Sequence, residues 1–193
     1  TSFGMIHSFA MRCRMSLLFF AAATLLAETR VFQGFTLIDG TGKAPVADAA
    51  MVVTDGRISY IGPKKGMKLP AGRPEVVELA GKYVIPGLFN LHCHLGNTKG
   101  LVQDPKNFTR DNVNDQLRVY AKNGVTAVLS MGSDQRLIFD MRNEQRAGRP
   151  SLTRIFTAGR GFTGKNGYPT AAPGMKGVPY EVTTEQEVID AKH

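Results

Sequence analysis

Short apolar runs rich in β-branched and aromatic residues recur through the first part of the chain. They cover residues 31–38, 49–54, 57–61 and 75–79. The dipeptide Asp55-Gly56 separates the second run from the third, and an Asp-Gly pair between two such runs is typical of a tight β-hairpin. The pattern predicts a small β unit, which we place at residues 28–82.

After Leu88 the pattern changes to an alternation of strands and helices. Strands are predicted at residues 88–95, 125–130 and 153–157, and the first two helices near 111–123 and from Ser133 or Asp134 to Gly148. A loop over 159–182 precedes a third helix, which Thr184 and Glu187 open as a capping box. Alternation of this kind predicts parallel βαβ units and an α/β fold class.

The first 27 residues have the pattern of a secretory signal. A basic stretch at Met11 to Met15 precedes an apolar run from Ser16 to Ala27, which is too short to cross a bilayer as a helix. We therefore predict a leader at residues 1–27 and a periplasmic or secreted protein, whose contact with a membrane is limited to this export signal. Without the leader, Cys93 is the only cysteine, so no disulfide forms within the chain.

The net charge of +8 does not indicate a nucleic-acid-binding protein. Lysines and arginines are scattered along the sequence and form no block of five or six, which is the arrangement of a solvated surface. We expect no nucleic-acid partner.

The candidate chemistry begins at His92 and His94. In a strand, side chains two residues apart point the same way and lie about 6.6 Å apart along the strand, close enough to share one metal ion. Pro86-Gly87 allows a sharp turn before this strand. The same alternation predicts that Asn90 shares the histidine face and that Leu91, Cys93 and Leu95 point the other way. Cys93 is then a small buried hydrophobe rather than a thiolate ligand.

Several motifs together resemble the metal-dependent amidohydrolase superfamily, in particular its exported imidazolonepropionase-like and prolidase-like members. The matching segments are Leu37 to Gly42, Asp55 to Ile58, Gly81 to Leu88, His92 to Leu95, Gly124 to Val128 and Arg154 to Arg160. The resemblance implies a TIM-like (β/α)8 metal-dependent hydrolase barrel, whose first three β/α units are residues 83–193, preceded by part of a β-sandwich at 28–82. A complete barrel takes about 250 residues, so we expect an N-terminal fragment that is inactive alone.

The resemblance also implies the activity. The parent enzyme would hydrolyse a C–N bond in a small-molecule amide, peptide or cyclic amide. The attacking water would be activated by one or two divalent metal ions, which we expect to be zinc. His92 and His94 are the implied metal ligands present, and the other ligands and the general acid/base are expected beyond residue 193. A deaminase of the same superfamily, which Asn90 favours, and a non-catalytic barrel relative are the alternatives. The oligomeric state stays open.

Two further residues are candidates for substrate binding. Arg160 follows the third strand and is positioned to meet an anionic group, although a surface salt bridge is the more frequent role of such an arginine. Tyr168 stands in Gly-Tyr-Pro where prolidase-like relatives often have Gly-His-Pro, so it either lines the substrate pocket or packs on the barrel rim.

Overall fold

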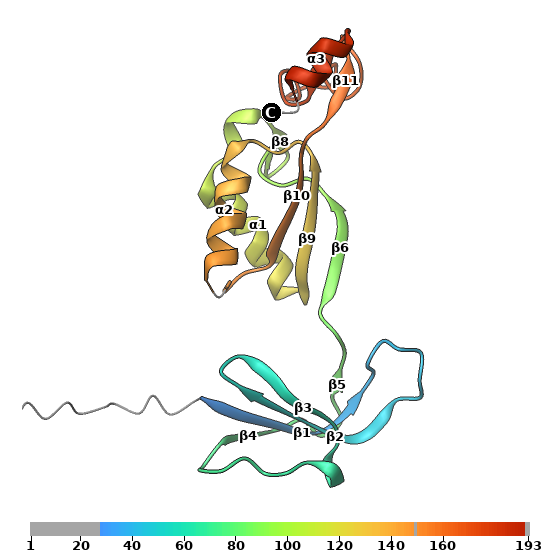
Figure 1. The fold of residues 1–193 in the computed structure, drawn as a ribbon, viewed down its shortest axis with the longest axis vertical. Helices are drawn as coiled ribbons and strands as arrows, with labels where there is room; N and C mark the ends of the chain where they lie inside the picture. The colour runs from blue at the N-terminus through green and yellow to red at the C-terminus, as the bar shows by residue number, and fades with distance from the viewer. Residues whose placement is uncertain (1–27, 149, 192–193) are drawn as a thin grey trace, which may run out of the picture. The chain divides into compact units, whose positions relative to one another are not determined.

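The computed structural model describes residues 28–148 and 150–191, and the predicted leader lies outside them. Within this range the chain forms two compact units, one of residues 28–38 and 44–84 and the other of residues 39–43 and 85 onward (Figure 1). No described helix is long and apolar enough to cross a membrane.

The first unit is one five-stranded sheet. Its elements are β1 (Thr29–Leu37), β2 (Val46–Thr54), β3 (Arg57–Pro63), the 3-10 helix η1 (Lys64–Gly66), β4 (Glu75–Glu78) and β5 (Tyr83–Val84). The strand order is β3-β2-β1-β4, with β5 also paired to β1. The hairpin between β2 and β3 is confirmed, and Asp55 and Gly56 have the positive φ angles, 51° and 72°, that a tight turn needs. Phe35, Leu37 and Ala49 form its buried core.

The second unit contains the predicted βαβ units. Its elements are β6 (Leu88–Cys93), β7 (Thr98–Lys99), β8 (Val102–Gln103), η2 (Pro105–Asn107), α1 (Arg110–Lys122), β9 (Val125–Gly132), α2 (Arg136–Ala147), β10 (Arg154–Arg160), β11 (Phe162–Gly164), β12 (Tyr180–Val182) and α3 (Glu185–Asp190). Strands β10, β9 and β6 pair in parallel in that order. Helices α1 and α2 lie on the same face of this sheet (Figure 1). The mixed α/β fold is confirmed.

One face of the parallel sheet is closed by the helices. The buried cluster between them joins residues of the strands, and Leu95 just after β6, to residues of the helices, namely Cys93, Leu95, Val128 and Ile155 with Val113, Leu117, Ile138 and Met141. Burial of a large aliphatic side chain contributes about 1.5–3 kcal/mol, so this cluster is the main source of stability of the unit. On the strands, Phe89 and Leu91 remain 68% and 70% exposed, and Phe156 is 50% exposed.

Two predicted local features differ from the structure and one agrees. The N-cap of α2 is Gln135, without a side-chain cap bond, because Asp134 is turned into the protein instead. The predicted loop 159–182 contains the parallel pair β11 and β12. The capping box of Thr184 and Glu187 at α3 is confirmed.

Candidate functional site

The two predicted ligands lie together at the carboxyl end of β6. The ring centroids of His92 and His94 are 5.3 Å apart, with the ring planes at 78°. Both side chains are exposed. The Nδ1 atom of His94 lies 2.7 Å from the carbonyl oxygen of Met131 in β9. A carbonyl oxygen only accepts hydrogen bonds, so Nδ1 carries the proton and the lone pair of a neutral ring is on Nε2. His94 thus presents a nitrogen that can bind a metal.

A β-bulge in β6 overturns part of the predicted alternation. Asn90 pairs with Val128 and Cys93 pairs with Ser130, so β6 has one residue more than β9 between these pairs. Asn90 therefore points to the helix side, where its Nδ2 donates to the hydroxyl of Tyr120 at 3.3 Å. The predictions that Asn90 shares the histidine face and that Leu91 is buried with Cys93 are wrong. An inserted residue reverses the alternation on one side of the bulge.

Cys93 is a buried free thiol, as predicted. It is 6% exposed and belongs to the core cluster under the helices. Burial raises the pKa of its thiol to about 11, because the thiolate would lose its hydration. The structure thus favours the packing role over that of a thiolate ligand.

The sequence interpretation missed a buried carboxylate beside the histidines. Asp134 is fully buried after β9, and its two oxygens accept hydrogen bonds from Ser130, at 2.5 Å, and from Thr157 in β10. Burial raises the pKa of Asp134, and the bonds from the two hydroxyls act in the opposite direction. Asp134 follows a predicted strand, but this residue type also caps helices, and the sequence offers Asp134 as a candidate N-cap of the second helix.

The loop that follows the histidines is held by α1. Asn112 is buried and its Nδ2 lies within 2.8–3.0 Å of the carbonyl oxygens of Gly96, Thr98 and Asn107. Gln116 donates to the Thr98 carbonyl and accepts from the Gly96 amide, both at 2.8 Å. Neither residue was expected to have this role, because helix residues pointing at a loop leave no periodic pattern in the sequence.

Arg160 holds the loop that precedes β12. Its guanidinium donates to the carbonyl oxygens of residues 177, 178 and 179 at 2.7–3.2 Å and stacks 3.9 Å above the ring of Tyr180. These contacts are not the surface salt bridge that we considered more frequent for such an arginine. The substrate-binding role of Arg160 stays a prediction.

Tyr168 lies on the exposed loop after β11. Its side chain is 87% exposed, and its carbonyl oxygen accepts a hydrogen bond from Thr163 at 2.8 Å. The structure does not bring it together with the histidines through any contact among the described residues. Its role at a substrate pocket stays a prediction.

The donor set suits part of a metal site. Two imidazole nitrogens are typical zinc ligands, but a zinc site takes at least three protein ligands. The described residues contain no group of three or more His, Cys, Asp or Glu side chains placed to hold one ion. His92 and His94 therefore fit a metal as two of its ligands.

Comparison with known proteins finds relatives that match part of the chain. No protein-family model matches the chain. The chain is 38% identical over 72 residues to the 5-methylthioadenosine/S-adenosylhomocysteine deaminase of Symbiobacterium thermophilum, which covers 37% of this chain and 16% of the relative. It is 34% identical over 117 residues to the enamidase of Eubacterium barkeri, which covers 60% of this chain and 28% of the relative. The chain thus spans less than a third of either relative.

A solved structure shares the fold of this chain. A Xaa-Pro dipeptidase with bound methionine superposes with a TM-score of 0.64 over 84% of this chain and 43% of that chain, at 22% identity. This likeness shows a shared fold. These relatives and this structure belong to the amidohydrolase superfamily, and the chain is similar to them over part of their length. The amidohydrolase superfamily is generally metal-dependent, which agrees with the nitrogen that His94 leaves free.

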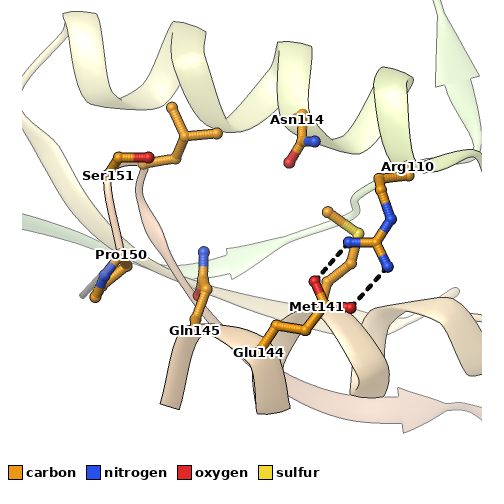
Figure 2. A pocket seen from close by; sticks show the side chains of 8 residues that line it. Arg110, Asn114, Met141, Glu144, Gln145, Pro150 and Ser151 are labelled. Carbon is orange, nitrogen blue, oxygen red and sulfur yellow. Dashed lines mark hydrogen bonds and ion pairs between the residues drawn. The ribbon is translucent and has the colours of Figure 1, made fainter. Parts of the chain in front are cut away.

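One pocket of this chain lies away from the histidines. Figure 2 shows the pocket of about 210 Å³ between α1 and α2, lined also by residues 150–152. Arg110 and Glu144 form a two-bond ion pair across it, at 2.6 and 2.8 Å. Both side chains are about half exposed, so the pair joins the two helices at the surface. We assign the pocket no part in the site.

Proposed function

We propose that this chain is part of a metal-dependent amidohydrolase that hydrolyses a C–N bond in a small amide, dipeptide or cyclic amide. The observation that carries the proposal is the pair His92 and His94 at the carboxyl end of β6, with Nε2 of His94 left free by the bond from Nδ1 to Met131. Catalytic ligands of (β/α)8 barrels lie at this end of the strands. We take β6, β9 and β10 as the first three barrel strands.

The names of the relatives support this reaction class. A deaminase, an enamidase and a dipeptidase all cleave C–N bonds with water. Because the chain spans only part of each, the activity of the whole protein is inferred from them by similarity. We place the remaining ligands and the proton-transferring group on later barrel strands.

Each proposed residue has a separate task. His92 and His94 would hold a divalent ion, and their nitrogen ligands favour zinc. Such an ion lowers the pKa of a bound water and polarises a carbonyl group. Arg160 would shape the rim by fixing residues 177–179, and Tyr168 would contact substrate from its exposed loop.

The test uses the whole enzyme of which we propose this chain is a part. We expect His92→Gln and His94→Gln each to lower kcat/KM for dipeptide or cyclic-amide hydrolysis by more than about a hundredfold and to reduce the zinc content measured by elemental analysis. Arg154→Gln, an exposed residue at the opposite end of the sheet, is the matched control and should keep both. Hydrolysis that survives in the two histidine variants would refute the proposal.

Deamination is the second candidate, because the relative from Symbiobacterium thermophilum is named as a deaminase. Asn90 no longer favours it as a pocket residue, since it points to Tyr120. The two reactions differ in their products. Release of ammonia from an amino-substituted ring, without a new carboxylate, would identify a deaminase. Metal binding without turnover of either substrate class would identify a non-catalytic relative.

We also propose that the protein is exported, from the basic and apolar pattern of residues 1–27. Sequencing the amino terminus of protein recovered outside the cytoplasm tests this. Cleavage near Ala27 is expected, and a mature protein that still starts at or before Met11 would contradict it.

A further inference from the structure

Strand pairing between β6 and β9 stops before His94. The ladder between β6 and β9 ends at the pair Cys93 and Ser130. Two residues after Cys93, the amide of Leu95 donates instead to the hydroxyl oxygen of Ser130 at 3.1 Å. A side chain thus replaces the backbone acceptor directly after His94.

Asp134 determines how this hydroxyl is oriented. The Ser130 hydroxyl donates to Oδ1 of Asp134 at 2.5 Å. An ionised carboxylate can only accept, so the single proton of Ser130 points to Asp134 and an oxygen lone pair is left for the Leu95 amide. The second carboxylate oxygen accepts from Thr157, whose own oxygen accepts from the Gly159 amide at 2.9 Å. Asp134 therefore joins the carboxyl ends of β6, β9 and β10.

His94 is held at two points by the same short segment. Its backbone is fixed through Leu95 and Ser130, and its ring is fixed through the carbonyl oxygen of Met131. Ser130 and Met131 are consecutive, so a shift of one moves the other. Such an arrangement determines which ring nitrogen carries the proton.

We propose that Ser130 and Asp134 are positioning residues that hold His94 with Nδ1 protonated and Nε2 free to bind a metal. The metal part rests on the proposed function, and the tautomer part does not. Partners of this kind outside the ligand set change metal affinity by about 10–100-fold when they are removed.

The first measurement needs no metal. The full chain is labelled with 15N-histidine, and long-range 1H–15N spectra of the metal-free protein report the tautomer of His94, whose signals are identified by their loss in His94→Gln. We expect the Nδ1-protonated pattern in the wild type and a mixture of tautomers in Ser130→Ala. Asp134→Asn keeps the side-chain shape but leaves one acceptor for two hydroxyls, so it should give the same change and serves if Ser130→Ala fails to fold.

Thr153→Val is the matched control. Thr153 is also buried, and its hydroxyl donates to the Val125 carbonyl at 2.6 Å at the other end of the sheet. It should lower stability and leave the His94 pattern unchanged. An unchanged pattern in folded Ser130→Ala or Asp134→Asn would overturn the proposal, and so would an equal change in Thr153→Val.

The second measurement separates this inference from the proposed function. Titration with Co²⁺, followed by its visible absorption, should show about 10–100-fold weaker binding in Ser130→Ala than in the wild type. If His92→Gln and His94→Gln bind Co²⁺ as tightly as the wild type, the metal site is refuted while the tautomer result still decides the positioning role. If they lose Co²⁺ but Ser130→Ala and Asp134→Asn keep wild-type affinity, the positioning role is refuted alone.

Discussion

The two ends of the parallel sheet β6, β9 and β10 are built from different kinds of residue. At the end where the strands begin, Thr153 is the buried polar residue. The other buried polar residues of the described chain lie at or next to the end where the strands finish, namely Asn97, Asn112, Ser130, Ser133 and Asp134. Burial of polar groups costs stability unless they are hydrogen-bonded, so the finishing end holds most of the buried groups that need hydrogen-bond partners.

The two ends of the sheet also differ in how completely their polar groups are hydrogen-bonded. The Thr153 hydroxyl and the Leu88 amide at the starting end both bond to nearby carbonyl groups, at 2.6 and 3.0 Å. The buried side-chain atoms without a partner among the described residues are Asn97 Oδ1, Ser133 Oγ and Thr170 Oγ1, all in loops that follow β6, β9 or β11. Departures from local consistency are expected at functional sites. The unsatisfied buried groups thus lie in loops at the end of the sheet that carries the proposed site.

The largest effect that tests this comparison is on Leu95. The side chain is 1% exposed and lies directly after His94, so Leu95→Ala should lower the free energy of unfolding by about 2–5 kcal/mol and also weaken Co²⁺ binding. Ile155→Ala, in the core near the start of β10, should lower stability but leave Co²⁺ binding unchanged. Urea unfolding and Co²⁺ titration measure the two effects. Equal metal affinity in both variants would break the comparison.

The next effect concerns two loops at the finishing end. A Cβ atom on Gly174 would lie 1.9 Å from the carbonyl oxygen of Gln103, and Gly174 has a φ of +73°. Gly174→Ala should therefore cost roughly 2–4 kcal/mol from strain and overlap. Gly177 has a φ of +75°, and a Cβ atom added there would meet nothing within 4 Å, so Gly177→Ala isolates the backbone cost. Thermal unfolding and proteolysis of the loops measure both, and similar losses in the two variants would mean that the loops are not packed as described.

The sequence predicts what local pattern determines. Asp55-Gly56, Thr184 with Glu187, and the order of strands and helices in the second unit are each encoded within a few residues, and the structure confirms them. The spacing of His92 and His94 also identifies the candidate site, because the two residues are near neighbours in the chain.

The features that the sequence does not predict depend on distant partners. The bulge that turns Asn90 to the helices depends on the register with β9, which a single strand does not reveal. Asp134 and Ser130 are ambiguous locally, since the same residue types cap helices, and only the arrival of Thr157 from β10 makes them a buried network. The partners of Arg160 lie 17–19 residues away in a loop without periodicity.

A smaller effect tests how the loop after β6 is held. Asn112→Ala removes the amide that reaches three loop carbonyls and should cost about 1–3 kcal/mol. Hydrogen exchange should then accelerate in residues 96–107 and stay unchanged in the first residues of β9. Asn114→Ala, two residues along the same helix and outside this network, is the control. Exchange that accelerates throughout the second unit would show that Asn112 supports the whole core rather than this end.

The smallest effect is expected at a surface pair remote from the histidines, the Arg110–Glu144 pair in Figure 2. The hydrogen bonds from Arg110 lower the pKa of Glu144 below its ordinary value of 4.5. A carboxyl group whose pKa is lowered by folding binds fewer protons in the native state, so it stabilises the protein above the unfolded pKa, and this contribution is lost as the pH falls through the folded value. Glu144→Gln should therefore reduce stability slightly at neutral pH and not at strongly acidic pH, and added salt should shrink the difference.

Glu181→Gln, at an exposed glutamate that forms no ion pair within the described residues, is the control for removing a charge. Urea unfolding between pH 3 and pH 7 decides the matter, and a loss as large as that in Leu95→Ala would mean that the helical surface, rather than the finishing end of the sheet, governs the stability of this unit.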